Sequence, residues 1–232
     1  MSPFTLGSVA KLALSRPPLR ALPTLILDLD ETILHRPNGW LDKLALYSPV
    51  PLYAVGVPYT GALSSLRTLG SSFNLVAVTA RQALAERNTA QWLAAQGLGE
   101  LPVLYASSVH SGDGTRGAFK ASAIRHVRAA GWQPVAGVGD RPSDMEAYAA
   151  EGLLALMVTH AEGATAAATE RHATALRQAQ LQLPLARVAH FSDCPRSCAI
   201  LGLQAPVQGP AVWQQVSGHL LASRSQLLQP SP

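Results

Sequence analysis

Two carboxylates two residues apart, Asp28 and Asp30, directly follow a short apolar run near the start of the chain. The run from Leu25 to Leu27 lies between Pro23 and these acids, which is typical of a buried strand. Residues two apart on an extended chain point to the same side, so both carboxylates can face one site. Two like charges this close repel each other unless a cation or a shared proton compensates. From this stretch alone, an acidic turn without a catalytic role is an equal alternative.

Three more groups that suit phosphate chemistry follow further along the chain. Thr79 ends a second apolar run, and Asp140 and Asp144 follow the fourth, over residues 134–139. Lys120 is one of only three lysines in the chain. Clustered carboxylates are ligands that Mg²⁺ prefers, and a hydroxyl and a lysine can orient and neutralise a phosphoryl group. One carboxylate can also attack phosphorus to form an aspartyl-phosphate.

The elements that must position these groups alternate between strands and helices. Expected strands cover residues 25–27, 73–79, 102–105, 134–139 and 153–158. Expected helices cover residues 60–69, 82–96, 118–130 and 145–151, with Leu84 packed on the sheet and a polar loop over 107–116. This alternation predicts an α/β fold with a doubly wound parallel sheet. The carboxyl ends of all strands then share one edge, where we expect the acids, Thr79 and Lys120 to converge.

Length and composition allow a single domain with appendages, or at most two small domains. The chain has 232 residues, of which 48% are hydrophobic and 14% are charged. The net charge of +4, without a cluster of Lys and Arg, indicates either a preference for anionic ligands such as phosphates or merely a slightly basic protein. No apolar run reaches transmembrane length, and the two cysteines do not form a disulfide framework. We therefore expect a cytoplasmic protein with no membrane partner.

Three segments are expected to flank or interrupt a core over residues 23–160. Residues 1–22 contain no acid and predict a leader outside the core. Residues 35–59 are rich in proline and aromatics and predict a flap or short hairpin, with a plain surface loop as the alternative. Residues 161–232 predict a C-terminal extension packed on the core. Its expected elements are a helix over 164–182, a short strand over 187–191 and a last helix over 213–223.

In this order and spacing, the residues resemble the motifs of the haloacid dehalogenase (HAD) superfamily, mainly its phosphatases. Residues 28–32 (DLDET) are similar to the first motif, DxDx[TV], and residues 139–144 (GDRPSD) to the fourth, GDxxxD. Thr79 and Lys120 match the second and third motifs. The resemblance covers about residues 23–160. It implies a Rossmann-like HAD core and a Mg²⁺-dependent phosphomonoester hydrolase that acts through an aspartyl-phosphate.

The resemblance also implies a role for each matched position. Asp28 would be the nucleophile and a Mg²⁺ ligand. Asp30 would protonate the leaving group and then activate water, with its backbone carbonyl at the metal. An acid at Asp30 favours phosphatase chemistry, because an alkoxide leaving group needs a proton. The other implied roles are Mg²⁺ binding by Asp140 and Asp144, and phosphate binding by Thr79, the amide of Ala80 and Lys120.

Two further groups of residues leave alternatives open. Arg81 could bind the substrate phosphate or cover the start of the following helix. His190, Cys194 and Cys198 recur every four residues, which on a helix would align them as soft metal ligands. Free thiols and a surface histidine are the simpler expectation for these three.

Other functions compatible with the same motifs are a phosphotransferase or mutase of the superfamily, and a HAD-fold binding or scaffold protein without turnover. A scaffold would be expected to lack Asp28 or Asp30, and both are present. The intervals 32–79 and 81–120 are mostly filled by expected strands and helices, so a large lid is not expected, which favours hydrolysis. The expected substrate is a nucleotide-sized phosphoester or an accessible chain end, with nucleic acid only as a substrate end. The sequence indicates no oligomeric state.

Overall fold

A computed structural model describes residues 22–35, 56–106, 113–160, 173–174, 188–194 and 211–229 of the chain. Within these residues, the largest element is a six-stranded sheet in the order β5-β4-β1-β6-β7-β8, in which all neighbouring strands run parallel. The strands are β1 (Thr24–Leu27), β4 (Asn74–Gln82), β5 (Val103–Ala106), β6 (Pro134–Gly139), β7 (Leu154–Thr159) and β8 (Val188–Ser192). The predicted α/β fold with a doubly wound parallel sheet is thereby confirmed.

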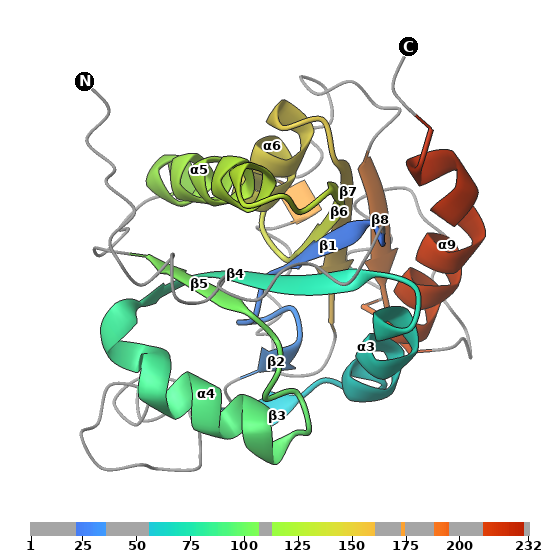
Figure 1. The fold of residues 1–232 in the computed structure, drawn as a ribbon. Helices are drawn as coiled ribbons and strands as arrows, with labels where there is room; N and C mark the ends of the chain where they lie inside the picture. The colour runs from blue at the N-terminus through green and yellow to red at the C-terminus, as the bar shows by residue number, and fades with distance from the viewer. Residues whose placement is uncertain are drawn as a thin grey trace, which may run out of the picture.

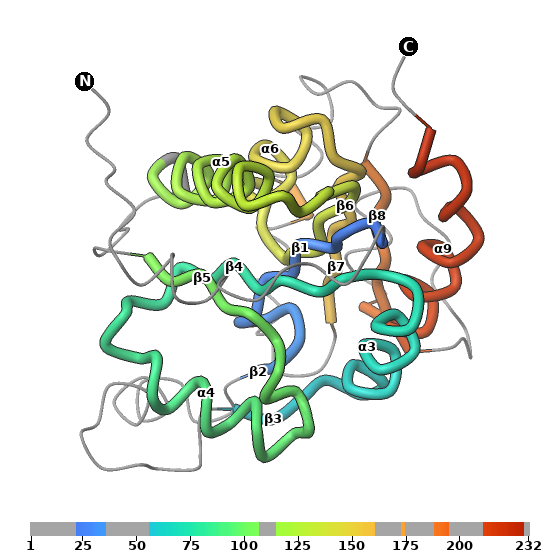
Figure 2. Tube along the Cα trace, viewed as in Figure 1, coloured from blue at the N-terminus to red at the C-terminus, as the bar shows by residue number. Residues whose placement is uncertain are grey.

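Helices cover both faces of the sheet. Figure 1 shows α5 and α6 on one face and α3, α4 and α9 on the other. Figure 2 follows β1 along the middle of the sheet, between β4 and β6. The helices are α3 (Ala62–Gly70), α4 (Glu86–Ala95), α5 (Asp113–Ala129), α6 (Pro142–Ala150) and α9 (Val212–Leu227), with a 3-10 turn, η1 (Ala83–Ala85), before α4.

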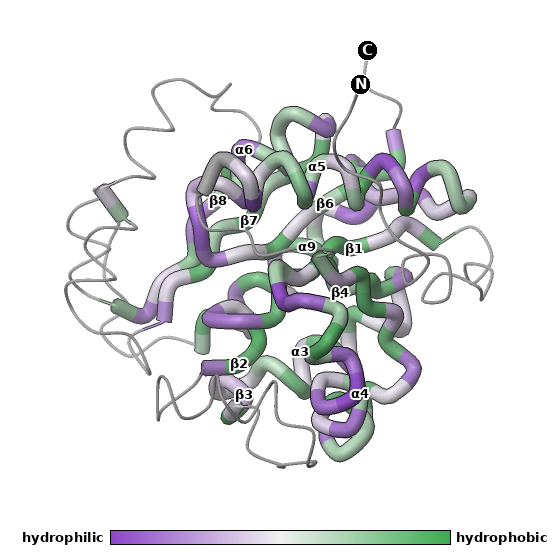
Figure 3. Tube along the Cα trace, turned by 90° about the vertical axis from the view of Figure 1, so that its left-hand side faces the viewer, coloured by the Kyte–Doolittle hydropathy of each residue, from purple (hydrophilic) through white to green (hydrophobic). Residues whose placement is uncertain are grey.

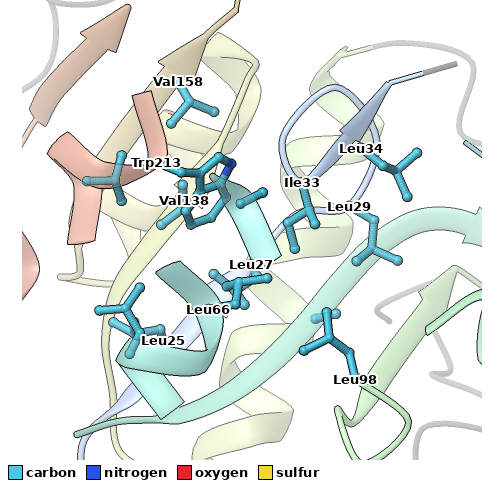
Figure 4. Packing of buried hydrophobic residues seen from close by; sticks show 14 of the residues in the cluster. Leu25, Leu27, Leu29, Ile33, Leu34, Leu66, Leu98, Val138, Val158 and Trp213 are labelled. Carbon is cyan, nitrogen blue, oxygen red and sulfur yellow. The ribbon is translucent and has the colours of Figure 1, made fainter. Parts of the chain in front are cut away.

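Strand β1 is the centre of the core because its side chains alternate between two hydrophobic clusters. Leu25 and Leu27 pack with residues of α3, α4 and α9, and Figure 4 shows them near Leu66 of α3. Ile26 points to the opposite face and packs with residues of α5 and α6. All three are fully buried, and each contributes about 1.5–3 kcal/mol by leaving water. Along α3 and α4, hydrophobic residues alternate with hydrophilic ones (Figure 3).

The loop after β1 is held in place by the C-terminal helix and by the end of β7. Trp213 of α9 is fully buried and lies beside Val138 and Val158 (Figure 4). Its indole Nε1 donates a hydrogen bond to the carbonyl oxygen of Thr32 at 2.9 Å. The Nε2 atom of His160, directly after β7, lies 3.2 Å from the same oxygen. These contacts fix the segment that carries the first acidic pair.

The two ends of the predicted flap pair with each other. Strands β2 (Leu34–His35) and β3 (Val57–Pro58) form a short antiparallel sheet, as expected for a hairpin. Trp92 of α4 donates its Nε1–H to the carbonyl oxygen of Gly56 at 2.9 Å. This hydrogen bond connects the two-stranded sheet to α4. Residues 36–55 of the flap lie outside the described residues.

Several expected boundaries were wrong. Strand β4 continues past Thr79 to Gln82, and α5 begins at Asp113, within the stretch expected to be a loop. Leu84 was expected to pack on the sheet, but it lies in the 3-10 turn with 81% of its surface exposed. A tight turn has a different side-chain period from an α-helix, so the helical spacing that placed Leu84 inward does not hold there.

Other expectations fall largely outside the described part of the chain. The leader over residues 1–21 is not described, and residues 173–174 are helical within the expected helix over 164–182. Where the structure describes the chain, it contains no helix both long and apolar enough to span a bilayer.

Candidate active site

The site lies where the strand order reverses. From β1 the chain moves outward to β4 and β5, then returns to β6 on the other side of β1. Such a reversal opens a crevice at the carboxyl ends of the two central strands. Asp28 directly follows β1 and Asp140 directly follows β6. The Asp28 amide donates to the carbonyl oxygen of Val138 at 2.9 Å, so the two strand ends are fastened side by side.

Three carboxylates gather in this crevice. One oxygen from each of Asp28, Asp140 and Asp144 lies within 4.8 Å of the other two. All three residues are at least nine-tenths buried. Asp28 and Asp140 come from the strand ends, and Asp144 comes from the first turn of α6. Oxygen atoms at these separations can share a single cation.

Lys120 reaches the same cluster from α5. Its Nζ atom lies 3.1 Å from Oδ1 of Asp28 and 2.6 Å from Oδ1 of Asp144. One turn earlier, Gly117 lets the two helix N-termini approach, since a Cβ there would lie 3.2 Å from the carbonyl oxygen of Ser143. The close packing of α5 against α6 therefore brings the buried ammonium to the carboxylates.

The position of Asp144 depends on a second glycine. A Cβ at Gly139 would lie 2.8 Å from the Cβ of Asp144 and would also collide with its carboxylate. The backbone amide of Arg141 donates a long hydrogen bond of 3.4 Å to Oδ2 of Asp144, so the same carboxylate also caps the start of α6. The spacing of residues 139–144 thus lets the carboxylate of Asp144 cap the N-terminus of α6 and also face the crevice.

The electrostatics of the cluster indicate an excess of negative charge. Burial raises the pKa of Asp28 to about 6, because the opposing effect of Lys120 is smaller than that of burial, and Asp144 and Asp30 raise the pKa further. Burial, Asp144 and Asp28 raise the pKa of Asp140 well above its usual value. Burial alone would lower the pKa of Lys120, but Asp144 and Asp28 raise it above its usual value. With all three carboxylates ionised, the one ammonium leaves two negative charges, which one divalent cation would balance; the raised pKa values are the cost of ionising the cluster without such a cation.

The donor set fits Mg²⁺. All three ligand candidates supply carboxylate oxygen, and the group contains neither sulfur nor imidazole. Hard cations such as Mg²⁺ and Ca²⁺ take such ligands, whereas zinc and copper prefer sites with nitrogen or sulfur. Together with the raised pKa values, the chemistry of the donors shows that Asp28, Asp140 and Asp144 could hold a hard divalent cation such as Mg²⁺.

Asp30 lies apart from this cluster and has a different partner. Its two carboxylate oxygens accept hydrogen bonds from Arg81, at 2.9 Å from Nε and 2.8 Å from Nη2. The Asp30 side chain keeps 20% of its surface exposed, which makes it the most open of the four site carboxylates. The pair Arg81–Asp30 is the main feature that the sequence interpretation missed.

Thr79 and Ala80 lie on the β4 side of Asp28. Leu27 pairs with Ala77, so Asp28 lies one residue, and Thr79 two residues, beyond the last pair of β1 and β4. Thr79 is buried, and its Oγ1 accepts a hydrogen bond from the amide of Arg81 at 3.2 Å. Their role in phosphate binding stays a prediction.

A stack of aromatic rings supports the loop after Asp30 and was also missed. Glu31 adopts a left-handed backbone conformation with φ of 59°, which is uncommon for a residue with a side chain. Tyr59 donates its hydroxyl hydrogen to Oε2 of Glu31 at 2.8 Å and stacks on His160 with ring centroids 3.6 Å apart. Burial lowers the pKa of His160 to about 4, so its ring is neutral at neutral pH. The sequence contained one indication of this role, because His160 directly follows a strand and so lies at the carboxyl edge of the sheet.

The expected short strand over residues 187–191 is confirmed, and it excludes the alternative in which His190 aligns with the cysteines on a helix. His190 lies on strand β8, and Cys194 follows the strand end as a free thiol. Nε2 of His190 lies 2.9 Å from Oγ1 of Thr159 on the neighbouring strand. Burial lowers the pKa of His190 to about 4. Cys198 lies outside the described residues.

No protein-family model matches the chain, and no curated protein sequence matches it. A haloacid dehalogenase-like family hydrolase from Streptococcus pneumoniae is similar in structure at 14% identity with a TM-score of 0.47, over 76% of this chain and 96% of that chain. A protein described as a beta-phosphoglucomutase from Thermotoga maritima is similar at 15% identity with a TM-score of 0.43, over 78% of this chain and 97% of that chain.

A chain of the Pnkp1/Rnl/Hen1 RNA repair complex is similar at 13% identity with a TM-score of 0.46. The similarity covers 62% of this chain and 45% of that chain, so this chain spans less than half of that protein. With TM-scores below 0.5, these similarities assign no chemistry to the site, which has to follow from its own residues.

Proposed function

We propose that the chain is a Mg²⁺-dependent phosphomonoester hydrolase that works through an aspartyl-phosphate at Asp28. The observation that carries the proposal is the buried cluster of Asp28, Asp140, Asp144 and Lys120 at the point where the strand order reverses. Its two surplus negative charges suit a divalent cation, and the cation in turn makes the crevice able to accept a phosphate. The motif resemblance to HAD phosphatases supports the same assignment.

The residues divide the reaction between them. In the first step, a carboxylate oxygen of Asp28 bonds to phosphorus, the bond from phosphorus to the ester oxygen breaks, and that oxygen takes the proton that Asp30 carries in its acid form. In the second step, Asp30, now a carboxylate, takes a proton from water, the water oxygen bonds to phosphorus, and the bond to Asp28 breaks. Inorganic phosphate leaves, and Asp28 is again a carboxylate and Asp30 again a carboxylic acid.

The remaining residues neutralise charge. Lys120 holds Asp28 and Asp144 in place and offsets part of their charge. The hydroxyl of Thr79 and the amide of Ala80 would bind the phosphoryl oxygens beside Asp28. Asp28, Asp140 and Asp144 would hold Mg²⁺, with the backbone carbonyl of Asp30 as a further ligand. The ion would supply the positive charge that lets a carboxylate approach a phosphate dianion.

Hydrolysis is favoured over phosphoryl transfer because the described chain adds little above the crevice. Between Arg81 and Lys120, residues 82–106 form the 3-10 turn, α4 and β5, and α5 starts at Asp113. An open edge gives a small substrate little enclosure, so binding energy has to come from a larger surface. The substrate we propose is therefore a nucleotide-sized phosphoester or the phosphorylated end of a chain, nucleic acid included only in that form.

The test is a hydrolysis assay over phosphorylated sugars, nucleotides, phosphopeptides and end-phosphorylated oligonucleotides, with Mg²⁺ and with a chelator. We expect Mg²⁺-dependent release of phosphate, with the larger substrates having the higher specificity constants. Asp28→Asn should abolish release, whereas Glu146→Gln, at an exposed position of the helix that carries Asp144, should leave it unchanged. Metal-independent release, or unchanged release by Asp28→Asn, would contradict the proposed function.

A further inference from the structure

Arg81 is a buried charge with an unusual set of partners. Its side chain is only 2% exposed, although arginine rarely lies in protein interiors without a specific partner. Nε and Nη2 donate two parallel hydrogen bonds to the two oxygens of Asp30. This forked pairing fixes the plane of a carboxylate as well as its position, which a lysine cannot do.

The guanidinium is itself held from a neighbouring helix. Nη1 donates to Oγ1 of Thr89, in the first turn of α4, at 2.9 Å. Thr89 is fully buried. A buried hydrogen-bond network thus runs from α4 through Arg81 on β4 to Asp30.

These contacts exclude the direct binding of substrate phosphate by Arg81. A guanidinium has five N–H donors, and three of them already point at Asp30 and Thr89. With so little of its side chain exposed, Arg81 offers no surface to a phosphate. The exposed member of the pair is Asp30, so any effect of Arg81 on a substrate has to pass through that carboxylate.

Stability alone does not account for this pair. A buried ion pair is often no more stabilising than a well-packed apolar pair of the same size, because both charges lose their hydration. What the fork does provide is a fixed orientation. Reactions at a bound substrate are sensitive to such orientation, and a displacement of about 1 Å can cost about 100-fold in rate.

We propose that Arg81 is a positioning residue that aims the carboxylate of Asp30 at the leaving-group oxygen of the substrate. This inference rests on the proposed phosphatase function, in which Asp30 transfers a proton to that oxygen while the bond from phosphorus to it breaks. Thr89 contributes to this positioning because it accepts a hydrogen bond from Nη1 of the guanidinium. Arg81 itself contacts neither the phosphoryl group nor the metal.

The test uses two phosphate monoesters with the same phosphoryl group and different leaving groups. Release of an alkoxide needs a proton from Asp30, whereas release of nitrophenolate needs it far less. Arg81→Lys keeps the charge and loses the fork. We expect it to lower kcat for an alkyl phosphate by about 100-fold and for 4-nitrophenyl phosphate by less than about tenfold, with KM little changed for both.

Three variants serve as controls. Arg67→Lys alters an exposed arginine that donates to the carbonyl oxygen of Gln96 and has no contact with Asp30 in the described residues, so both rates should stay at the wild-type level. Thr89→Val leaves the ion pair intact and should reduce the alkyl rate in the same direction but less. In an Asp30→Asn background, Arg81→Lys should cause no further loss, because no proton donor is left to aim.

The possible failures are distinguishable. If wild type hydrolyses neither ester, the proposed function and this inference both fall. If wild type is active but Arg81→Lys slows both esters equally, or raises KM instead of lowering kcat, the positioning role is wrong and the phosphatase assignment stands. If Arg81→Lys does not fold, as judged by circular dichroism, the leaving-group dependence of Thr89→Val decides between the same two outcomes.

Discussion

Replacing Asp28 by Asn should abolish turnover and, at the same time, stabilise the metal-free protein. Burial and neighbouring carboxylates raise the pKa of Asp28 from 3.8 to about 6. Each pKa unit corresponds to about 1.4 kcal/mol, so ionised Asp28 costs the fold about 3 kcal/mol of stability. Asparagine has nearly the same shape, keeps an oxygen for Lys120 and carries no charge, so it removes most of this cost.

The pH dependence has a definite sign. In the unfolded chain Asp28 ionises near pH 3.8, and in the folded chain near pH 6. The folded state therefore binds the proton more tightly, and its stability falls as the pH rises from about 4 through 6, after which this contribution is constant. The free energy of unfolding of Asp28→Asn should not contain this decrease. The variant should therefore be only slightly more stable than wild type at pH 4, and more stable by the full amount at pH 8.

The assay is thermal unfolding in excess chelator at pH 4 and pH 8. For a chain of this size about 1 kcal/mol shifts the midpoint by about 2–4 °C, so we expect Asp28→Asn to unfold about 6–12 °C above wild type at pH 8. Glu146→Gln, an exposed change of the same kind, should match wild type at both pH values. An Asp28→Asn protein that is less stable than wild type at pH 8 would refute the reasoning about charge in the cluster.

Two further predictions concern the metal and the glycine beside Asp144. Chelation should remove turnover and Mg²⁺ should restore it. Mg²⁺ should also raise the unfolding temperature of wild type, because it binds only the folded site. It should not raise the unfolding temperature of Asp140→Asn. Turnover in excess chelator would contradict the first part, and equal stabilisation of Asp140→Asn the second. Gly139→Ala should lower turnover at least about tenfold and destabilise the fold by about 1–3 kcal/mol, because its Cβ collides with Asp144. Gly218→Ala on α9, where a Cβ meets nothing within 4 Å, should instead be neutral or slightly stabilising. Equal turnover and equal stability of the two variants would show that the contact with Asp144 is unimportant.

The sequence was sufficient to predict the fold because its signals were local. Apolar runs such as Pro134 to Gly139 coincide with a strand to the residue, since a buried parallel strand has to be apolar on both faces. The positions of Asp28 and Asp140 follow from the same pattern, because a residue directly after a parallel strand lies at the carboxyl edge. The arrangement of the cluster was thus accessible once the sheet was recognised.

The features that were missed depend on contacts distant in sequence. The partner of Arg81 lies 51 residues away, and no local pattern indicates whether a guanidinium turns inward to a carboxylate or outward to a ligand. His190 lies in a strand, as expected for residues 187–191, but its contact with Thr159 on β7 bridges 31 residues and could not be read from the local pattern. Leu84 was misplaced because a 3-10 turn interrupts the start of the helix.

The most direct test of the central claim is to find the phosphoryl group on the enzyme during turnover. Wild-type protein with Mg²⁺ and substrate would be quenched in acid and digested, and its peptides compared by mass spectrometry with those of Asp28→Asn. A phosphoryl group on the peptide that contains Asp28, removed by hydroxylamine as an acyl phosphate and missing from Asp28→Asn, is the predicted result. A phosphoryl group on another residue of an active enzyme, or undiminished turnover by Asp28→Asn, would contradict the assignment of Asp28 as the nucleophile.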